Sequence, residues 1–184
     1  MPLKITFELS DKDLKFFSQK AAAVAERAAE RSEAQILAGA EALVERMSAD
    51  VPAFVRDRVG HLEAMVAMLR DELWQLEGKD RERVLKAVAY FAEPNDLVPD
   101  DIPAIGFIDD AVMIELVVRS LRHELEAYAD FRKVQKTKDK VSDPTDRESW
   151  LAHRREKLQE RMRRRRKRDR AASSGPGSRI FRLF

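Results

Sequence analysis

Five aspartates in one short segment are the residues whose types and spacing could do chemistry. They lie within residues 90–118, YFAEPNDLVPDDIPAIGFIDDAVMIELVV, together with three prolines. Carboxylate oxygens are the ligands that Mg²⁺ and Ca²⁺ prefer, and a loop stiffened by prolines could hold several of them together. The candidate metal ligands, which would also serve a metal-dependent enzyme, are Asp96, Asp100, Asp101, Asp109 and Asp110.

The same aspartates fit a structural role, which we favour over metal binding. Asp109 and Asp110 stand where a helix is expected to begin, and a carboxylate there accepts hydrogen bonds from free backbone N–H groups. Asp96 and Asp100 lie near prolines, where such side chains often bond the backbone of a turn. No spacing typical of an EF-hand or a zinc site occurs. We therefore expect no metal and no other cofactor.

Few other residues indicate catalysis. Glu115 interrupts an apolar run and precedes Arg119 by four residues, a spacing that favours a buried ion pair over an active-site acid. The three histidines fall on separate predicted helices, and there is no cysteine. No glycine-rich phosphate loop, nucleophile elbow or dinucleotide fingerprint is present. The residues do not argue for an enzyme.

A basic run near the C-terminus carries the clearest functional signal. Ten residues, 161–170, contain eight positive charges and one negative charge. Such a run binds phosphates by releasing counterions, so anionic lipid, nucleic acid and ribosomal RNA are all candidate ligands. A solvated tail without a ligand is the structural alternative. The candidate binding residues are Arg161, Arg163, Arg164, Arg165, Arg166, Lys167, Arg168 and Arg170.

The last residues of the chain add apolar side chains to this basic end. Exposed aromatic residues at a terminus are costly without a partner. A basic helix followed by an apolar tip suits a membrane interface, and it also suits a peptide that docks into a groove on another protein. The candidate contact residues are Ile180, Phe181, Leu183 and Phe184.

Charge is divided unevenly along the 184 residues. Residues 153–184 hold 13 basic and 3 acidic residues, whereas the remainder holds 22 basic and 30 acidic ones. An acidic body with a basic end is expected to seek anionic surfaces. The N-terminus lacks the apolar core of a signal peptide, and no apolar run is long enough to span a bilayer. We expect a cytoplasmic protein, either free or peripheral to a membrane.

Residues 1–78 are expected to form an extended segment and a helical hairpin. Residues 3–9 alternate apolar and polar side chains, a short strand pattern. One helix is expected from Ser10 to about Ser48, and a second from Pro52 to the glycine at position 78. The second carries apolar residues at coiled-coil spacing, which predicts a stalk within one chain or a homodimer seam. These residues are Val55, Val59, Leu62, Val66, Leu69, Leu73 and Leu76.

Residues 79–135 are expected to form a compact helix–loop–helix module. Asp80 would cap a helix to about Ala92, and a loop would lead to a second helix beginning at Asp109. Residues 136–184 would comprise a polar linker, a charged helix to about Arg170 and the apolar-tipped tail. The fold class is therefore all-α.

The central module resembles a known family. The order Tyr-x-x-x-Pro-x-Asp-Leu-Val-Pro-Asp-x-Ile-Pro-x-Ile-Gly-Phe-Ile-Asp-Asp, within residues 84–128, is similar to that of the YkvA-like family, small and mostly bacterial domains of unknown function. The resemblance implies a fold but no reaction. We therefore expect a non-enzymatic interaction or scaffold protein whose basic end engages an anionic membrane or a protein partner. A nucleic-acid- or ribosome-associated factor is the alternative.

Overall fold

A computed structural model describes residues 8, 10–28, 31–47, 53–92, 108–138 and 144–172. The elements are helices, and the described residues form no strand, so the all-α class is confirmed. Of the proposed N-terminal strand only Glu8 is described. The elements are α1 (Asp11–Ala28), α2 (Glu33–Met47), α3 (Ala53–Arg70), α4 (Gly78–Ala89), the 3₁₀ turn η1 (Tyr90–Ala92), α5 (Ile108–Ser120), α6 (Arg122–Lys138) and α7 (Pro144–Ala172).

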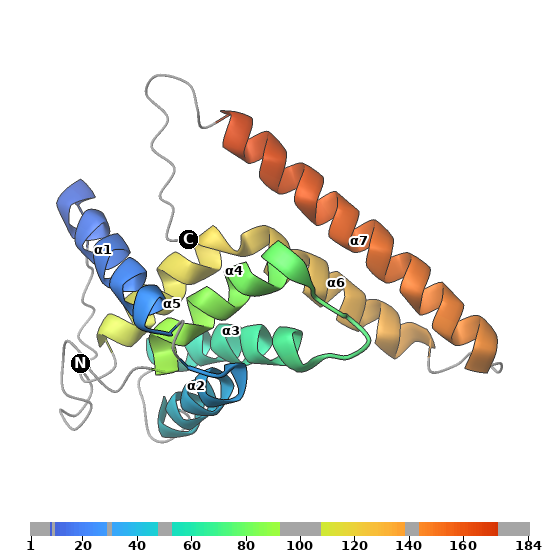
Figure 1. Ribbon diagram of the computed structural model, residues 1–184, viewed down its shortest axis with the longest axis horizontal. Helices are drawn as coiled ribbons and strands as arrows, with labels where there is room; N and C mark the ends of the chain where they lie inside the picture. Colours follow the sequence, from blue (N-terminus) through green and yellow to red (C-terminus); the bar gives the residue numbers. More distant parts are fainter. Residues whose placement is uncertain are drawn as a thin grey trace.

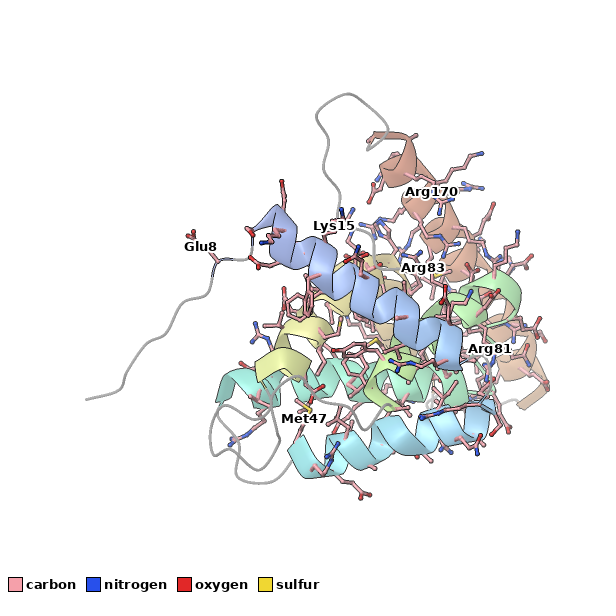
Figure 2. All side chains as sticks on the ribbon, turned by 60° about the vertical axis from the view of Figure 1, so that its left-hand side comes forward. Glu8, Lys15, Met47, Arg81, Arg83 and Arg170 are labelled. Carbon is pink, nitrogen blue, oxygen red and sulfur yellow. The ribbon has the colours of Figure 1, made fainter. Side chains whose placement is uncertain are left out.

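Two capping boxes divide the N-terminal region into α1 and α2. Ser10 caps α1 as expected, since its Oγ accepts from the backbone N–H of Asp13 at 3.4 Å and its own N–H donates to Asp13 Oδ2 at 2.8 Å. The single helix predicted to reach Ser48 is wrong, because a second cap starts α2 at Ser32. The Ser32 N–H donates to Gln35 Oε1 at 2.9 Å, and Gln35 N–H donates back to Ser32 Oγ at 3.3 Å. The separated α1 crosses the outside of the bundle (Figure 2), where it packs on α4 and η1.

The expected hairpin is formed by α2 and α3, which run antiparallel (Figure 1). Six of the seven residues at coiled-coil spacing are buried within the chain. Five of them lie on α3, which also packs against α4 and α5, and the sixth, Leu76, follows in the turn after α3. The seventh, Leu73, lies beyond the end of α3 and is 49% exposed. Association of two chains through this stripe stays a prediction, and the six buried members are already used inside one chain.

The end of α3 at Arg70 comes earlier than the apolar spacing predicted. Asp71 Oδ1 accepts hydrogen bonds from the backbone N–H groups of Leu73 at 2.9 Å and Trp74 at 3.1 Å, which turns the chain. Gly78 has a φ of 55° and is the first residue of α4, not the residue that ends the preceding helix. The turn places the fully buried Trp74 against Tyr128 and Phe131 of α6.

The last three helices complete the bundle. The helix predicted from Asp109 onward is interrupted at Leu121, which separates α5 from α6. The predicted charged helix is α7, which runs antiparallel to α6 along one outer edge of the molecule (Figure 1). Leu151 and Met162 of α7 are buried, and Trp150 and Leu158 are partly buried. One core therefore joins residues from α2 through α7.

Candidate anionic-surface interface on helix α7

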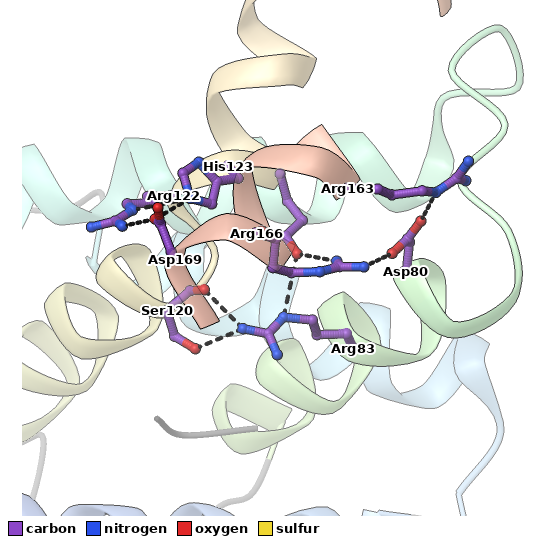
Figure 3. Close-up of polar contacts among 9 residues, drawn as sticks. Asp80, Arg83, Ser120, Arg122, His123, Arg163, Arg166 and Asp169 are labelled. Atoms are coloured by element: carbon purple, nitrogen blue, oxygen red, sulfur yellow. Dashed lines mark hydrogen bonds and ion pairs between the residues drawn. The ribbon is translucent and has the colours of Figure 1, made fainter. Parts of the chain in front are cut away.

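The basic run forms the C-terminal part of α7, and two of its arginines bind buried acids on the inner side of that helix (Figure 3). Arg163 Nε donates to Asp80 Oδ2 at 2.6 Å. Arg166 donates to Asp80 Oδ1 at 2.6 Å and to Glu124 Oε1 at 2.7 Å. Because Asp80 belongs to α4 and Glu124 to α6, these bonds fasten α7 to both helices.

A third arginine completes this charge cluster, whose members are Asp80, Arg83, Glu124, Arg163 and Arg166. Asp80 and Glu124 are 4% and 0% exposed, so both carboxylates need cationic partners. Arg83 Nε lies 3.3 Å from Glu124 Oε1, and Arg83 Nη2 donates to the backbone oxygen of Ser120 at 2.9 Å. Three guanidinium groups therefore surround two buried carboxylates where α4, α6 and α7 meet.

The pKa shifts in the charge cluster follow from burial and pairing. Burial acts to raise the pKa of Asp80, but hydrogen bonds from Arg163 and Arg166 outweigh it and lower the pKa. Burial acts to lower the pKa of Arg166, and its bonds to Asp80 and Glu124 raise it overall. Burial lowers the pKa of Arg83 despite the nearby Glu124. The cluster therefore holds Asp80 and Arg166 in their charged forms.

A second polar contact lies one turn further along α7. Asp169 Oδ2 accepts a hydrogen bond from Arg122 and lies 2.7 Å from His123 Nε2 (Figure 3). The bonds to His123 and Arg122 lower the pKa of Asp169. The only acid of the basic run is thus bound to α6, and it does not neutralise the outer side of α7.

The remaining cations of the run are divided between the flanks and the outer side of α7. Arg161 pairs with Asp130 and Arg165 with Glu126, both on α6. Arg164 pairs with Glu160 of its own helix. Lys167 and Arg168 are exposed, and neither side chain has a carboxylate partner among the described residues. Arg170 is exposed, and its positive charge lies near enough to Arg83 to help lower the pKa of Arg83.

The aspartate segment lies largely outside the described residues. Asp96, Asp100 and Asp101 fall in that undescribed part. Asp109 and Asp110 lie in the first turn of α5, as predicted, and Asp110 is buried. Over the described parts of the chain, no three His, Asp or Glu side chains are grouped to hold a metal ion. The tail residues Ile180, Phe181, Leu183 and Phe184 also lie outside the described residues.

The expected pair of Glu115 and Arg119 is present, although its acid is not buried. Arg119 Nε donates to Glu115 Oε1 at 2.9 Å, and Arg58 Nη2 lies 3.6 Å from Glu115 Oε2. The Glu115 side chain is 35% exposed, so the prediction of a buried pair is wrong. Glu115 lies where α5 packs against α3, and its carboxylate contacts both solvent and the two arginines.

The sequence interpretation missed Asp80, Arg83 and Glu124 as members of a site. Asp80 was expected to cap α4, but the N-cap is Glu77 and Asp80 turns toward α7. A signal was present in the spacing, since Asp80 precedes the buried Val84 by four residues. Glu124 likewise precedes the buried Tyr128 by four residues. An acid at a core-facing position of a helix therefore indicates a buried basic partner.

Comparisons with known proteins agree with the resemblance of the central motif. A family model described as "Protein of unknown function (DUF1232)" matches residues 84–116, from α4 into α5. The "Uncharacterized membrane protein YkvA" of Bacillus subtilis (strain 168) is 32% identical over 80 residues, which cover 40% of this chain and 74% of that protein. No solved structure matches the chain.

The described helices give one further finding, since none of them is both long and apolar enough to cross a bilayer. The matched family segment holds Val84, Val88 and Phe91 on one side of the undescribed loop and Met113 and Ile114 on the other, all buried in the common core. The family segment thus supplies part of the common core. With 74% of the Bacillus relative covered, the chain belongs to the YkvA-like family of proteins of unknown function.

Proposed function

We propose that this protein is a non-enzymatic interaction protein that binds an anionic membrane surface through its basic C-terminal segment. The observation that carries the proposal is the division of cations on α7. Arg163 and Arg166 are committed to buried acids, while Lys167 and Arg168 are exposed without a carboxylate partner among the described residues. Packing within the protein therefore leaves cations available to an external anion.

Three further considerations favour a membrane as that anion. The apolar tail, Ile180 to Phe184, would add an insertion that salt does not screen. The Bacillus relative is named a membrane protein, and no described helix of this chain could cross a bilayer. Peripheral attachment from the cytoplasmic side, where anionic lipids are abundant, reconciles these facts. A nucleic acid is the second candidate, because the same cations would bind its phosphates.

Vesicle sedimentation with the full chain tests the proposal. We expect binding to phosphatidylcholine vesicles that contain phosphatidylserine, little binding to phosphatidylcholine alone, and a decline with salt. Lys167→Gln with Arg168→Gln should weaken binding about fivefold for each cation removed. Lys12→Gln with Lys15→Gln is the matched control, because it removes two exposed charges from α1.

The tail has its own test. Phe181→Ser with Phe184→Ser should weaken vesicle binding at every salt concentration and leave oligonucleotide binding nearly unchanged, because burial of aromatic area resists screening. If oligonucleotides bind well and vesicles do not, the nucleic-acid function replaces the membrane function. If neither ligand binds, the proposal fails and docking to a protein groove becomes the better hypothesis.

A further inference from the structure

A straight row of cations runs along the outer side of α7 and extends well before the basic run. Its members follow one another at intervals of three, four, three and four residues, which keeps them on one face of a helix. All five are exposed. At about 1.5 Å per residue the row is about 21 Å long. This basic row consists of Arg154, Lys157, Arg161, Arg164 and Arg168.

The opposite side of α7 is held by the rest of the protein. Arg155 Nη1 donates to the Leu73 backbone oxygen at 3.3 Å, and Gln159 Nε2 donates to that of Trp74 at 2.8 Å. Arg163 and Arg166 continue this inner row into the charge cluster. At about 100° per residue, the inner row lies about 180° around the helix from the basic row. The contacts that dock α7 therefore turn the basic row outward.

Charges in the basic row are only partly neutralised. Arg161 and Arg164 pair with Asp130 and Glu160, and both arginine side chains remain at least half exposed. Lys157 and Arg168 have no carboxylate partner among the described residues. The guanidinium of Arg154 lies 5.2 Å from the ring centre of Trp150. Trp150 precedes Arg154 by four residues and therefore lies on the same side of α7 as the basic row.

We propose that α7 lies lengthwise on an anionic lipid surface, with the basic row contacting headgroup phosphates and Trp150 at the interface. This inference rests on the proposed function and deepens it, since it moves the contact to Arg154 and Lys157 and excludes the inner Arg163 and Arg166. Helix α7 is straight and lies at an outer edge of the molecule (Figure 1), so a row of cations along its outer side complements a flat charged surface. Tryptophan is enriched where membranes meet water. A single-stranded nucleic acid would instead call for several stacking aromatics, and the row ends in one.

The first test replaces the part of the row that lies outside the basic run. Arg154→Gln with Lys157→Gln should weaken sedimentation with phosphatidylserine vesicles by about fivefold per cation. Helicity measured by circular dichroism should not change, because both side chains are exposed. The control pair Lys12→Gln with Lys15→Gln should bind like wild type. Equal binding by the row variant and this control would overturn the inference, while the effect of Lys167→Gln with Arg168→Gln would still support the proposed function.

The second test uses tryptophan as a position reporter. The chain has two tryptophans, and Trp74 is 0% exposed whereas Trp150 is partly exposed. Vesicles of brominated lipid should quench the fluorescence of the wild type and leave that of Trp150→Phe unchanged. Strong vesicle binding without quenching would reject a lengthwise contact at this end of α7.

Two competition arms identify the source of the phosphate. Inorganic phosphate at millimolar concentration should fail to displace the protein, since a row of separate cations binds a surface and not a single ion. Displacement by inorganic phosphate would replace the surface with a phosphate site. Loss of oligonucleotide binding in Arg154→Gln with Lys157→Gln, with vesicle binding intact, would assign the row to nucleic acid and overturn the lipid proposal.

Discussion

Asp80 and Arg166 stand 86 residues apart in the sequence, yet Asp80 Oδ1 accepts a 2.6 Å hydrogen bond from Arg166 Nη2. The bond joins the first turn of α4 to the C-terminal half of α7. Arg163 binds the other oxygen of the same carboxylate. Asp80 thus holds the basic helix in one orientation, and the availability of the outer cations depends on it.

Removing the charge of Asp80 should therefore destabilise the protein. Asp80→Asn removes the buried carboxylate charge that Arg166 and Arg163 share, and we expect a loss of about 3 kcal/mol in the free energy of unfolding. Glu82→Gln is the matched control on the same helix, because Glu82 is exposed and its salt bridge is to the exposed Lys86, one helical turn away. Urea unfolding measures both. Equal midpoints for the two variants would contradict the fastening role of Asp80.

Acid should also remove the stabilisation that the charge of Asp80 provides. The pKa of Asp80 lies below the ordinary 3.8 in the folded protein, so the unfolded chain takes up its proton at higher pH than the folded one. The stabilisation is then complete above about pH 4 and is lost as the pH falls through the folded pKa. We expect the gap between the urea midpoints of wild type and Asp80→Asn to narrow below about pH 4. If the difference between the two urea midpoints stayed constant with pH, the charge of Asp80 would not be the source of the stabilisation.

Two helical glycines should respond in opposite directions to alanine. A Cβ added to Gly39 would lie 2.8 Å from both Cα and Cβ of Ala92, and the Cα cannot rotate away. Gly39→Ala should cost about 1–3 kcal/mol by overpacking α2 against η1. A Cβ on Gly60 of α3 would meet nothing within 4 Å, so Gly60→Ala should stabilise by up to about 1 kcal/mol. Thermal unfolding compares the two, and a stabilising Gly39→Ala would reject the close approach.

Tyr128 should titrate at unusually high pH. Burial, together with the charge of Asp71, raises its pKa to about 12, and its hydroxyl donates to Asp71 Oδ2 at 3.1 Å. A raised pKa gives stabilisation that is complete below the ordinary value of 10.0 and is lost as the pH rises through about 12. Tyr128→Phe should cost about 1 kcal/mol near neutral pH.

A second variant isolates that titration. The chain has two tyrosines, so Tyr90→Phe leaves Tyr128 as the only phenol that absorbance can follow. We expect ionisation near the raised value while the protein stays folded. If Tyr128 in the folded protein ionised at the ordinary tyrosine pKa, the hydrogen bond to Asp71 would not stabilise this turn.

Local patterns in the sequence were sufficient to predict the class of fold and several element ends. Ser10 with Asp13 predicts the start of α1 because a capping box is satisfied within four residues. The start of α5 near Asp109 and the helical character of α7 follow from equally local signals. The central motif identified the family, since its prolines and aspartates stand close together along the chain.

Tertiary contacts decided the features that local patterns do not contain. The coiled-coil spacing from Val55 to Leu76 continues through Asp71, but the chain turns there because the Asp71 side chain binds the backbone N–H groups that follow and Trp74 packs on α6. The spacing of apolar residues alone does not show that these contacts outweigh continuation of the helix. The helix from Asp109 is likewise interrupted at Leu121, which is fully buried.

The basic end of the chain shows the same division most clearly. Its sequence determined that residues 161–170 form a highly charged helix, because charge and helix propensity are properties of each residue. Only the packing of α7 against α4 and α6 decided which cations are committed and which face outward. Arg163 and Arg166 meet Asp80 and Glu124, which lie more than 40 residues away along the chain. Electrostatic pairing depends on distance in space, so helical spacing separates Arg166 from Arg168 by face but does not show which acids the inner arginines meet.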